Sequence, residues 1–169
     1  MHALYILAVW LHILAAVTWI GGMFFLVLVV VPWLRGGGGG IDAARFLRET
    51  GRRFRNISWV CFAIVVTTGS YALWMRGVTF ASFANPDWLA SSFGRLVLLK
   101  LTVFATVIVV SLVHDLVIGP RATTAITADP RSDVAATLRR RASLLARANV
   151  LMALVLVAIG DLLVRGWPW

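Results

Sequence analysis

The sequence has 169 residues, of which 60% are hydrophobic and 14% are charged. Soluble globular domains contain about 45–50% apolar and about 25% charged residues, so this composition excludes a disordered chain and argues against a soluble domain. The length is that of one domain. Cys61 is the only cysteine, which excludes an internal disulfide bond and a metal site built from paired cysteines.

The apolar residues fall into four blocks, at about residues 3–34, 57–75, 96–118 and 144–164. Each block is long enough for a membrane-spanning helix, which needs about 17–25 apolar residues. None of them alternates as the strands of a membrane barrel do, and in lipid each segment must satisfy its own backbone hydrogen bonds. The sequence therefore predicts an all-α fold, a transmembrane four-helix bundle that forms a single domain over residues 1–169. The first block has no basic segment before it and is too long for a signal peptide.

The net charge of +9 comes mainly from arginines whose positions predict the membrane topology. Most arginines lie in or beside two connecting segments, 35–56 and 119–143, and few lie in the segment between the second and third spans. By the positive-inside rule both segments are cytoplasmic, and both termini lie outside. No aromatic pattern or motif accompanies these arginines, so we expect the lipid bilayer to be their partner and not nucleic acid. We expect a multi-pass protein of the inner (plasma) membrane.

Local signals predict the structure of the two cytoplasmic segments. Residues 41–55 have helical spacing of apolar residues with arginines between them, which predicts a helix along the inner membrane surface. Gly119-Pro120 predicts the end of the third helix. Ser132 and Asp133 predict the capped start of a helix that runs into the fourth span. No internal repeat is evident in the sequence.

Ionisable side chains within the predicted spans are the candidates for function, because such groups are costly in a bilayer. They are His12, Lys100, His114, Asp115 and Asp161. At a rise of about 1.5 Å per residue, His12 lies about 12 Å, Lys100 about 7 Å and Asp161 about 6 Å from the outer membrane surface. We therefore expect these three at similar depths and His114 with Asp115 near the inner surface, which makes two polar layers.

Helical spacing places the candidates on faces suited to helix packing. On the first span, His12 shares a stripe with small residues, which favour close helix approach. Its other members include Ala15, Trp19, Gly22 and Met23. On the third span, one face carries Lys100, Phe104, Val107, Ser111 and His114. On the fourth, one face carries Asn149, Ala153, Leu156 and Gly160, and Asp161 lies about 100° beyond it.

A histidine among aromatic residues inside a membrane bundle suits a b-type haem. In this interpretation His12 is an axial ligand, and Lys100 is the second ligand or an electrostatic partner. Trp19 packs against the macrocycle, and Asp161 sets the charge of Lys100. The function is then electron transfer or oxidation of a membrane-accessible substrate, with a quinone or another redox partner.

Two other classes of function stay open. In the first, copper binds His12 and Met23 and passes to His114, although the chain has few of the Met and Cys residues that soft Cu(I) prefers. In the second, the protein is a non-catalytic membrane scaffold with two structural polar layers. Small-residue faces such as Gly21-Gly22 also permit a homo-oligomer.

The sequence also resembles known membrane families. CopD-type proteins, linked to copper resistance, have a first helix similar to residues 11–32, LHILAAVTWIGGMFFLVLVVVP. Later elements of that family resemble GRRFRNISWVCFAIVVTTGSYAL (51–73), SFGRLVLLKL (92–101) and HDLVIGPR (114–121). The order of histidine and lysine is similar to HemJ-type protoporphyrinogen oxidases, and this resemblance implies that His12 and Lys100 hold haem b. The CopD resemblance implies a role in copper uptake.

Overall fold

The computed structural model describes residues 2–37, 43–129 and 131–166. In these ranges the regular structure is helical, with short π and 3-10 segments and no strand. Four helical stretches are long and apolar enough to cross a membrane, namely His2–Leu34, Arg45–Met75, Ser92–Ile126 and Asp133–Arg165. The prediction of an all-α membrane protein with four spans is therefore confirmed.

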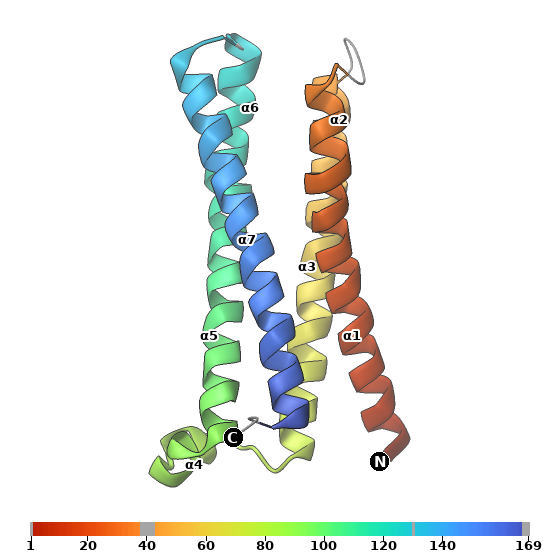
Figure 1. Ribbon diagram of the computed structural model, residues 1–169, viewed down its shortest axis with the longest axis vertical. Helices are drawn as coiled ribbons and strands as arrows, with labels where there is room; N and C mark the ends of the chain where they lie inside the picture. Colours follow the sequence, from red (N-terminus) through yellow and green to blue (C-terminus); the bar gives the residue numbers. More distant parts are fainter. Residues whose placement is uncertain (1, 38–42, 130, 167–169) are drawn as a thin grey trace. The chain divides into compact units, whose positions relative to one another are not determined.

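The chain divides into two compact units, Met1–Phe83 and Ala84–Trp169. In the first unit, α1 (His2–Phe25) continues through the π-helical segment η1 (Leu26–Val30) into α2 (Val31–Arg35). After the connection, α3 (Ala43–Met75) returns beside them, so that the unit is a helical hairpin (Figure 1).

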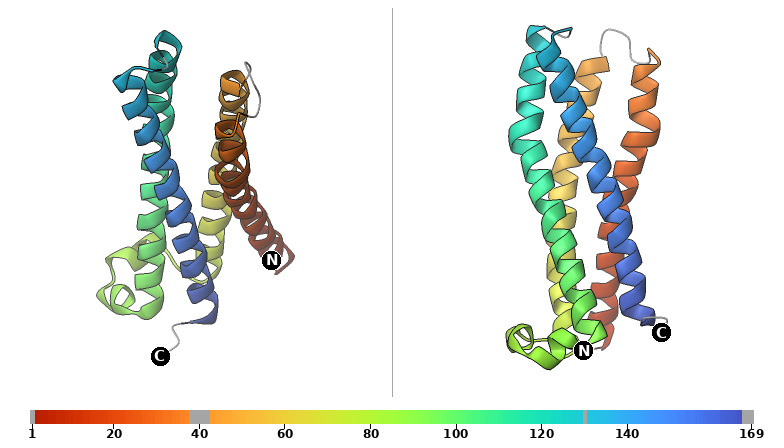
Figure 2. Two further views of the ribbon diagram at one scale, coloured as in Figure 1. Left: turned by 45° about the horizontal axis from the view of Figure 1, so that its top comes forward. Right: turned by 60° about the vertical axis from the view of Figure 1, so that its left-hand side comes forward.

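The second unit is also a helical hairpin (Figures 1 and 2). Its longest elements are α5 and α7, which lie side by side. In chain order the elements from the end of the first unit onward are η3 (Phe80–Ala84), α4 (Pro86–Ala90), α5 (Ser92–Val113), η4 (His114–Ile118), α6 (Gly119–Ala128) and α7 (Asp133–Arg165). The segments η1 and η4 are π-helical, and η3 is a 3-10 turn.

The helix predicted at residues 41–55 is confirmed in its described part, but its separation from the second span is wrong, because this part is the beginning of α3. Glu49 ion-pairs with Arg52 at 2.9 Å and with Arg53 at 3.2 Å, one helical turn away. Pairs at this spacing support a helix in water, so the charged end of α3 continues the spanning helix without a break. Residues 41 and 42 lie outside the described ranges.

The predicted end of the third helix at Gly119-Pro120 is also wrong, since the chain continues through η4 into α6. In η4 the N–H of Gly119 bonds to the carbonyl of His114, five residues back. Pro120 then lies in the first turn of α6, where its missing N–H costs little. The predicted cap before the fourth span is confirmed, because Ser132 Oγ accepts a hydrogen bond from the N–H of Ala135 at 3.2 Å.

Each hairpin buries the face that the sequence pattern predicts. In the first, α1 buries Ala15, Trp19 and Met23, and Trp19 packs edge-on against Phe62 of α3 at 5.0 Å between ring centroids. Gly22 has no Cβ, which allows the ring of Phe54 to lie directly against α1. In the second, Val107 of α5 and Ala153 of α7 are fully buried. Many large apolar side chains outside these contacts are not covered by other parts of the protein, as expected for a surface that faces lipid.

The turn between α4 and α5 generates a test of the fold. Ser91 Oγ accepts a hydrogen bond from the N–H of Gly94 at 3.0 Å, and a Cβ on Gly94 would collide with the carbonyl oxygen of Trp88. We expect Gly94→Ala to lower the free energy of unfolding by about 1–3 kcal/mol, as overpacking does elsewhere. Thermal unfolding in detergent measures this. Gly51→Ala is the control, since no atom lies within 4 Å of its new Cβ; an unchanged melting temperature in Gly94→Ala would contradict the packing.

Candidate functional site

His12 lies on α1 and faces α3 within the first hairpin. Its Nδ1 is 2.9 Å from Thr68 Oγ1. The next residue of α3 is Gly69, and a Cβ built there would lie 3.2 Å from His12 Cε1. The imidazole therefore packs against the backbone of α3 at a position where no side chain projects.

The Thr68 hydroxyl favours one tautomer of His12. Thr68 donates its one proton to the carbonyl of Ile64, at 2.6 Å. Its oxygen must then accept the hydrogen bond from Nδ1–H of His12, which leaves the lone pair of the neutral imidazole on Nε2. Metal-binding histidines are commonly oriented by such a bond on the other ring nitrogen. This geometry makes Nε2 of His12 suitable as a ligand atom.

Met23 lies on the same face of α1 as His12, and its side chain is buried. Eleven residues separate the two, which is about 16 Å along the helix axis. Ligand atoms lie about 2.0–2.3 Å from a bound metal such as zinc, so these two side chains cannot hold one ion between them. In the copper interpretation they are separate positions at different depths.

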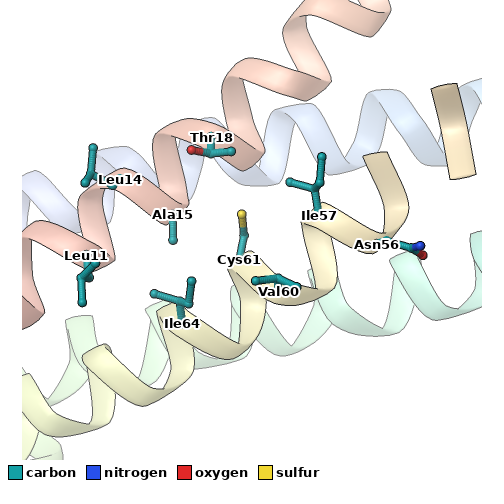
Figure 3. A pocket seen from close by; sticks show the side chains of 9 residues that line it. All are labelled: Leu11, Leu14, Ala15, Thr18, Asn56, Ile57, Val60, Cys61 and Ile64. Carbon is teal, nitrogen blue, oxygen red and sulfur yellow. The ribbon is translucent and has the colours of Figure 1, made fainter. Parts of the chain in front are cut away.

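A groove of about 450 Å³ between α1 and α3 holds the buried thiol of Cys61 (Figure 3). The thiol points from α3 toward α1. Ala15 and Thr18 line the groove and follow His12 by three and six residues, or about 5–9 Å along α1. The whole lining is Leu11, Leu14, Ala15, Thr18, Asn56, Ile57, Val60, Cys61 and Ile64. The sequence places Cys61 on the polar side of the second span, but a lone cysteine in an apolar run does not by itself indicate a ligand.

Trp19, the predicted aromatic neighbour of a haem, is part of the helix contact in the first hairpin. It is 5% exposed and packs on Phe62, which in turn packs edge-on against Trp59 at 5.4 Å. The structure thus gives this indole a packing role between α1 and α3.

Lys100 lies on α5 and faces α7 within the second hairpin. Its Nζ would be 3.6 Å from a Cβ built on Gly160, so the amine also lies against a glycine. The Asp161 carboxylate ion-pairs with Arg165 at 2.7 Å, and the role of Asp161 in setting the charge of Lys100 stays a prediction. The Asp161 side chain is 59% exposed, and the pair lies on one helix at a spacing of four residues.

The predicted inner polar layer has two contacts, both inside the second hairpin. Asn149 Nδ2 donates to Ser111 Oγ at 3.1 Å, which confirms that the predicted faces of α5 and α7 meet. In η4, Nδ1 of His114 lies 3.1 Å from Asp115 Oδ1. The Oδ1 atom of Asn149 is buried, and no described group hydrogen-bonds to it.

Within the described ranges, no three His, Cys, Asp or Glu side chains gather in a way that could hold a metal ion. Each hairpin instead offers candidate ligands that lie singly along its helices. They are His12, Cys61 and Met23 in the first unit, and Lys100 and His114 in the second. Such an arrangement differs from a closed structural zinc site, which has four protein ligands.

Comparison with known proteins identifies the family to which the chain belongs. The sequence model of copper resistance protein D (CopD) matches residues 48–163, which include Lys100 but begin after His12. An uncharacterized protein of Aquifex aeolicus (strain VF5) is 30% identical over 121 residues, which cover 69% of this chain and 71% of that protein. No solved structure matches. The family description agrees with the copper alternative, and it gives no support to the haem b interpretation.

The His12–Thr68 contact can be tested by removing the hydroxyl and keeping the shape. In Thr68→Val, Nδ1 loses its acceptor, and a hydrogen bond is worth about 1 kcal/mol. We therefore expect the Nδ1–H tautomer to lose its preference by about fivefold to tenfold, measured by nitrogen NMR of the labelled imidazole. Thr67→Val is the matched control, because Thr67 bonds to the carbonyl of Ala63 in the same way but forms no bond to His12. Equal spectra for the two variants would contradict the hydrogen bond.

Proposed function

The chain belongs to the copper resistance protein D family, and from this membership and the geometry of His12 we propose that it is a copper-binding membrane protein. The observation that carries the proposal is the hydrogen bond from His12 Nδ1 to Thr68 Oγ1, which directs the lone pair to Nε2. Imidazole is a good ligand for copper. His12 is therefore the primary binding residue in this proposal.

The soft side chains of the first hairpin support copper over harder ions. Cys61 and Met23 are 5% and 8% exposed, and both belong to the contact between α1 and α3 that also contains His12. Sulfur ligands favour Cu(I), whereas magnesium and calcium require oxygen ligands. Their spacing along the helices makes them successive positions for one ion, in accord with passage of copper through the membrane.

The proposal includes the membrane orientation. Basic residues are concentrated in the N-terminal parts of α3 and α7, next to the connections at residues 36–42 and 129–132. The positive-inside rule puts these ends in the cytoplasm and both termini outside the inner (plasma) membrane. His12 then lies toward the outer surface and Met23 deeper, so that copper from outside meets the imidazole first.

Copper titration of the purified full chain tests the function. We expect the protein to bind Cu(I) in competition with a chromogenic chelator, and we expect His12→Ala to weaken binding by at least about 100-fold. Changes in the hydrogen-bond partners of a metal ligand alone cost about 10- to 100-fold, and here the ligand itself is lost. His2→Ala is the control, because it removes an exposed histidine from the end of the same helix.

The same preparation distinguishes the other functional classes. A Soret band that disappears in His12→Ala would show that the protein binds haem b through His12. That result would overturn copper binding in favour of the electron-transfer interpretation, with a quinone as a candidate partner. Protein with neither a Soret band nor copper affinity would overturn both metal-binding interpretations and favour the non-catalytic membrane scaffold.

A further inference from the structure

The two hairpins are built to the same plan. Each begins with a long helix, passes through a π-helical segment of five residues, and continues into a helix with proline in its first turn. Each then returns through a helix of 33 residues, α3 in the first hairpin and α7 in the second. A π segment is a rare feature, so its occurrence at the same place in both hairpins is strong evidence of correspondence.

One shift in residue number relates the first helices of the two hairpins. The number rises by 88 from Leu26 to His114, where the π segments begin, and by 88 from Pro32 to Pro120. The same shift takes His12 to Lys100. It also takes buried Trp19 to buried Val107 and buried Val30 to buried Ile118. His12 on the first helix of one hairpin and Lys100 on the first helix of the other thus hold equivalent places.

A second shift, of 91, relates the return helices. It takes Gly69, which lies against His12, to Gly160, which lies against Lys100. It also takes buried Phe62 to buried Ala153 and buried Thr68 to buried Ile159. The glycine contacts were not used to derive the first shift, so they confirm the correspondence independently.

The correspondence is nearly invisible in the sequence. Under the first shift the identical pairs are ordinary membrane residues apart from the proline. They are Val9 and Val97, Leu11 and Leu99, Thr18 and Thr106, Ile20 and Ile108, Leu28 and Leu116, Val29 and Val117, and Pro32 and Pro120.

We propose that the chain is a tandem duplication of one hairpin, and that Lys100 occupies a second metal-ligand position equivalent to that of His12. The inference rests on the proposed copper binding. A lysine amine can bind a metal through its Nζ lone pair, but it must first lose a proton, so near pH 7 it is a weaker ligand than a neutral imidazole. Each hairpin thus presents one nitrogen ligand over a glycine of its return helix.

The pair Thr68 and Ile159 explains why the two positions need different neighbours. Imidazole has two ring nitrogens, and a hydroxyl beside it selects the tautomer and fixes the ring. A primary amine has a single nitrogen and needs no such selection. The second hairpin therefore has an apolar residue where the first has threonine.

The experiment moves the histidine–threonine pair from the first hairpin to the second. His12→Lys alone is expected to reduce Cu(I) affinity by at least 100-fold. The combination of His12→Lys, Lys100→His and Ile159→Thr is expected to restore affinity to within about tenfold of the unchanged protein. The same combination without Ile159→Thr is expected to remain about 10- to 100-fold weaker, since the imidazole then lacks its orienting hydroxyl. Helix content and the melting temperature establish that each variant is folded.

The control places the new histidine one residue away from the proposed position. Leu99 is 49% exposed on α5, so His12→Lys combined with Leu99→His should not recover copper binding. A folded triple variant that binds no better than His12→Lys would overturn the equivalence, as would equal rescue by Leu99→His. Failure of the unchanged protein to bind copper would instead overturn the proposed function, and the two failures are therefore distinguishable.

Discussion

The hydrogen bond between His12 and Thr68 is the interaction on which the functional argument depends. In a bilayer a histidine without a partner would be costly, and a lone threonine hydroxyl would bond only to its own helix. The Thr68 hydroxyl bonds both to its own helix and to the histidine, because it donates to the carbonyl of Ile64 and accepts from His12. One hydroxyl therefore links α1 to α3 and favours one tautomer of the imidazole, and in the proposed function this tautomer leaves Nε2 to bind copper.

The four spans and their packing faces could be predicted from the sequence, because lipid demands long apolar helices and close contacts require small residues. The lengths of the helices could not be predicted in the same way. Gly119-Pro120 is a stop signal in an ordinary helix, but η4 changes the hydrogen-bond register just before it, and Pro120 then begins a new helix. The arginines after residue 43 similarly suggest a surface helix, although they are the charged end of α3.

The candidate site was predictable only residue by residue. Spacing placed His12 and Lys100 on packing faces, and the structure confirms this for each hairpin. Spacing could not pair Thr68 with His12, because a contact across 56 positions leaves no local pattern. The correspondence of the two hairpins was missed for a related reason. Membrane helices tolerate exchange among Leu, Val, Ile and Phe, so packing positions persist while identities disappear.

The two π segments show how far the hairpins have diverged. η1 consists of Leu26 to Val30 and contains no polar side chain, whereas η4 begins with His114 and Asp115. Since the first hairpin forms the same segment from apolar residues alone, the polar pair is not what makes the π turn. The two hairpins therefore share a common arrangement of helices, and their side chains differ at two levels, the nitrogen-bearing residue over the glycine and the residues that open the π segment.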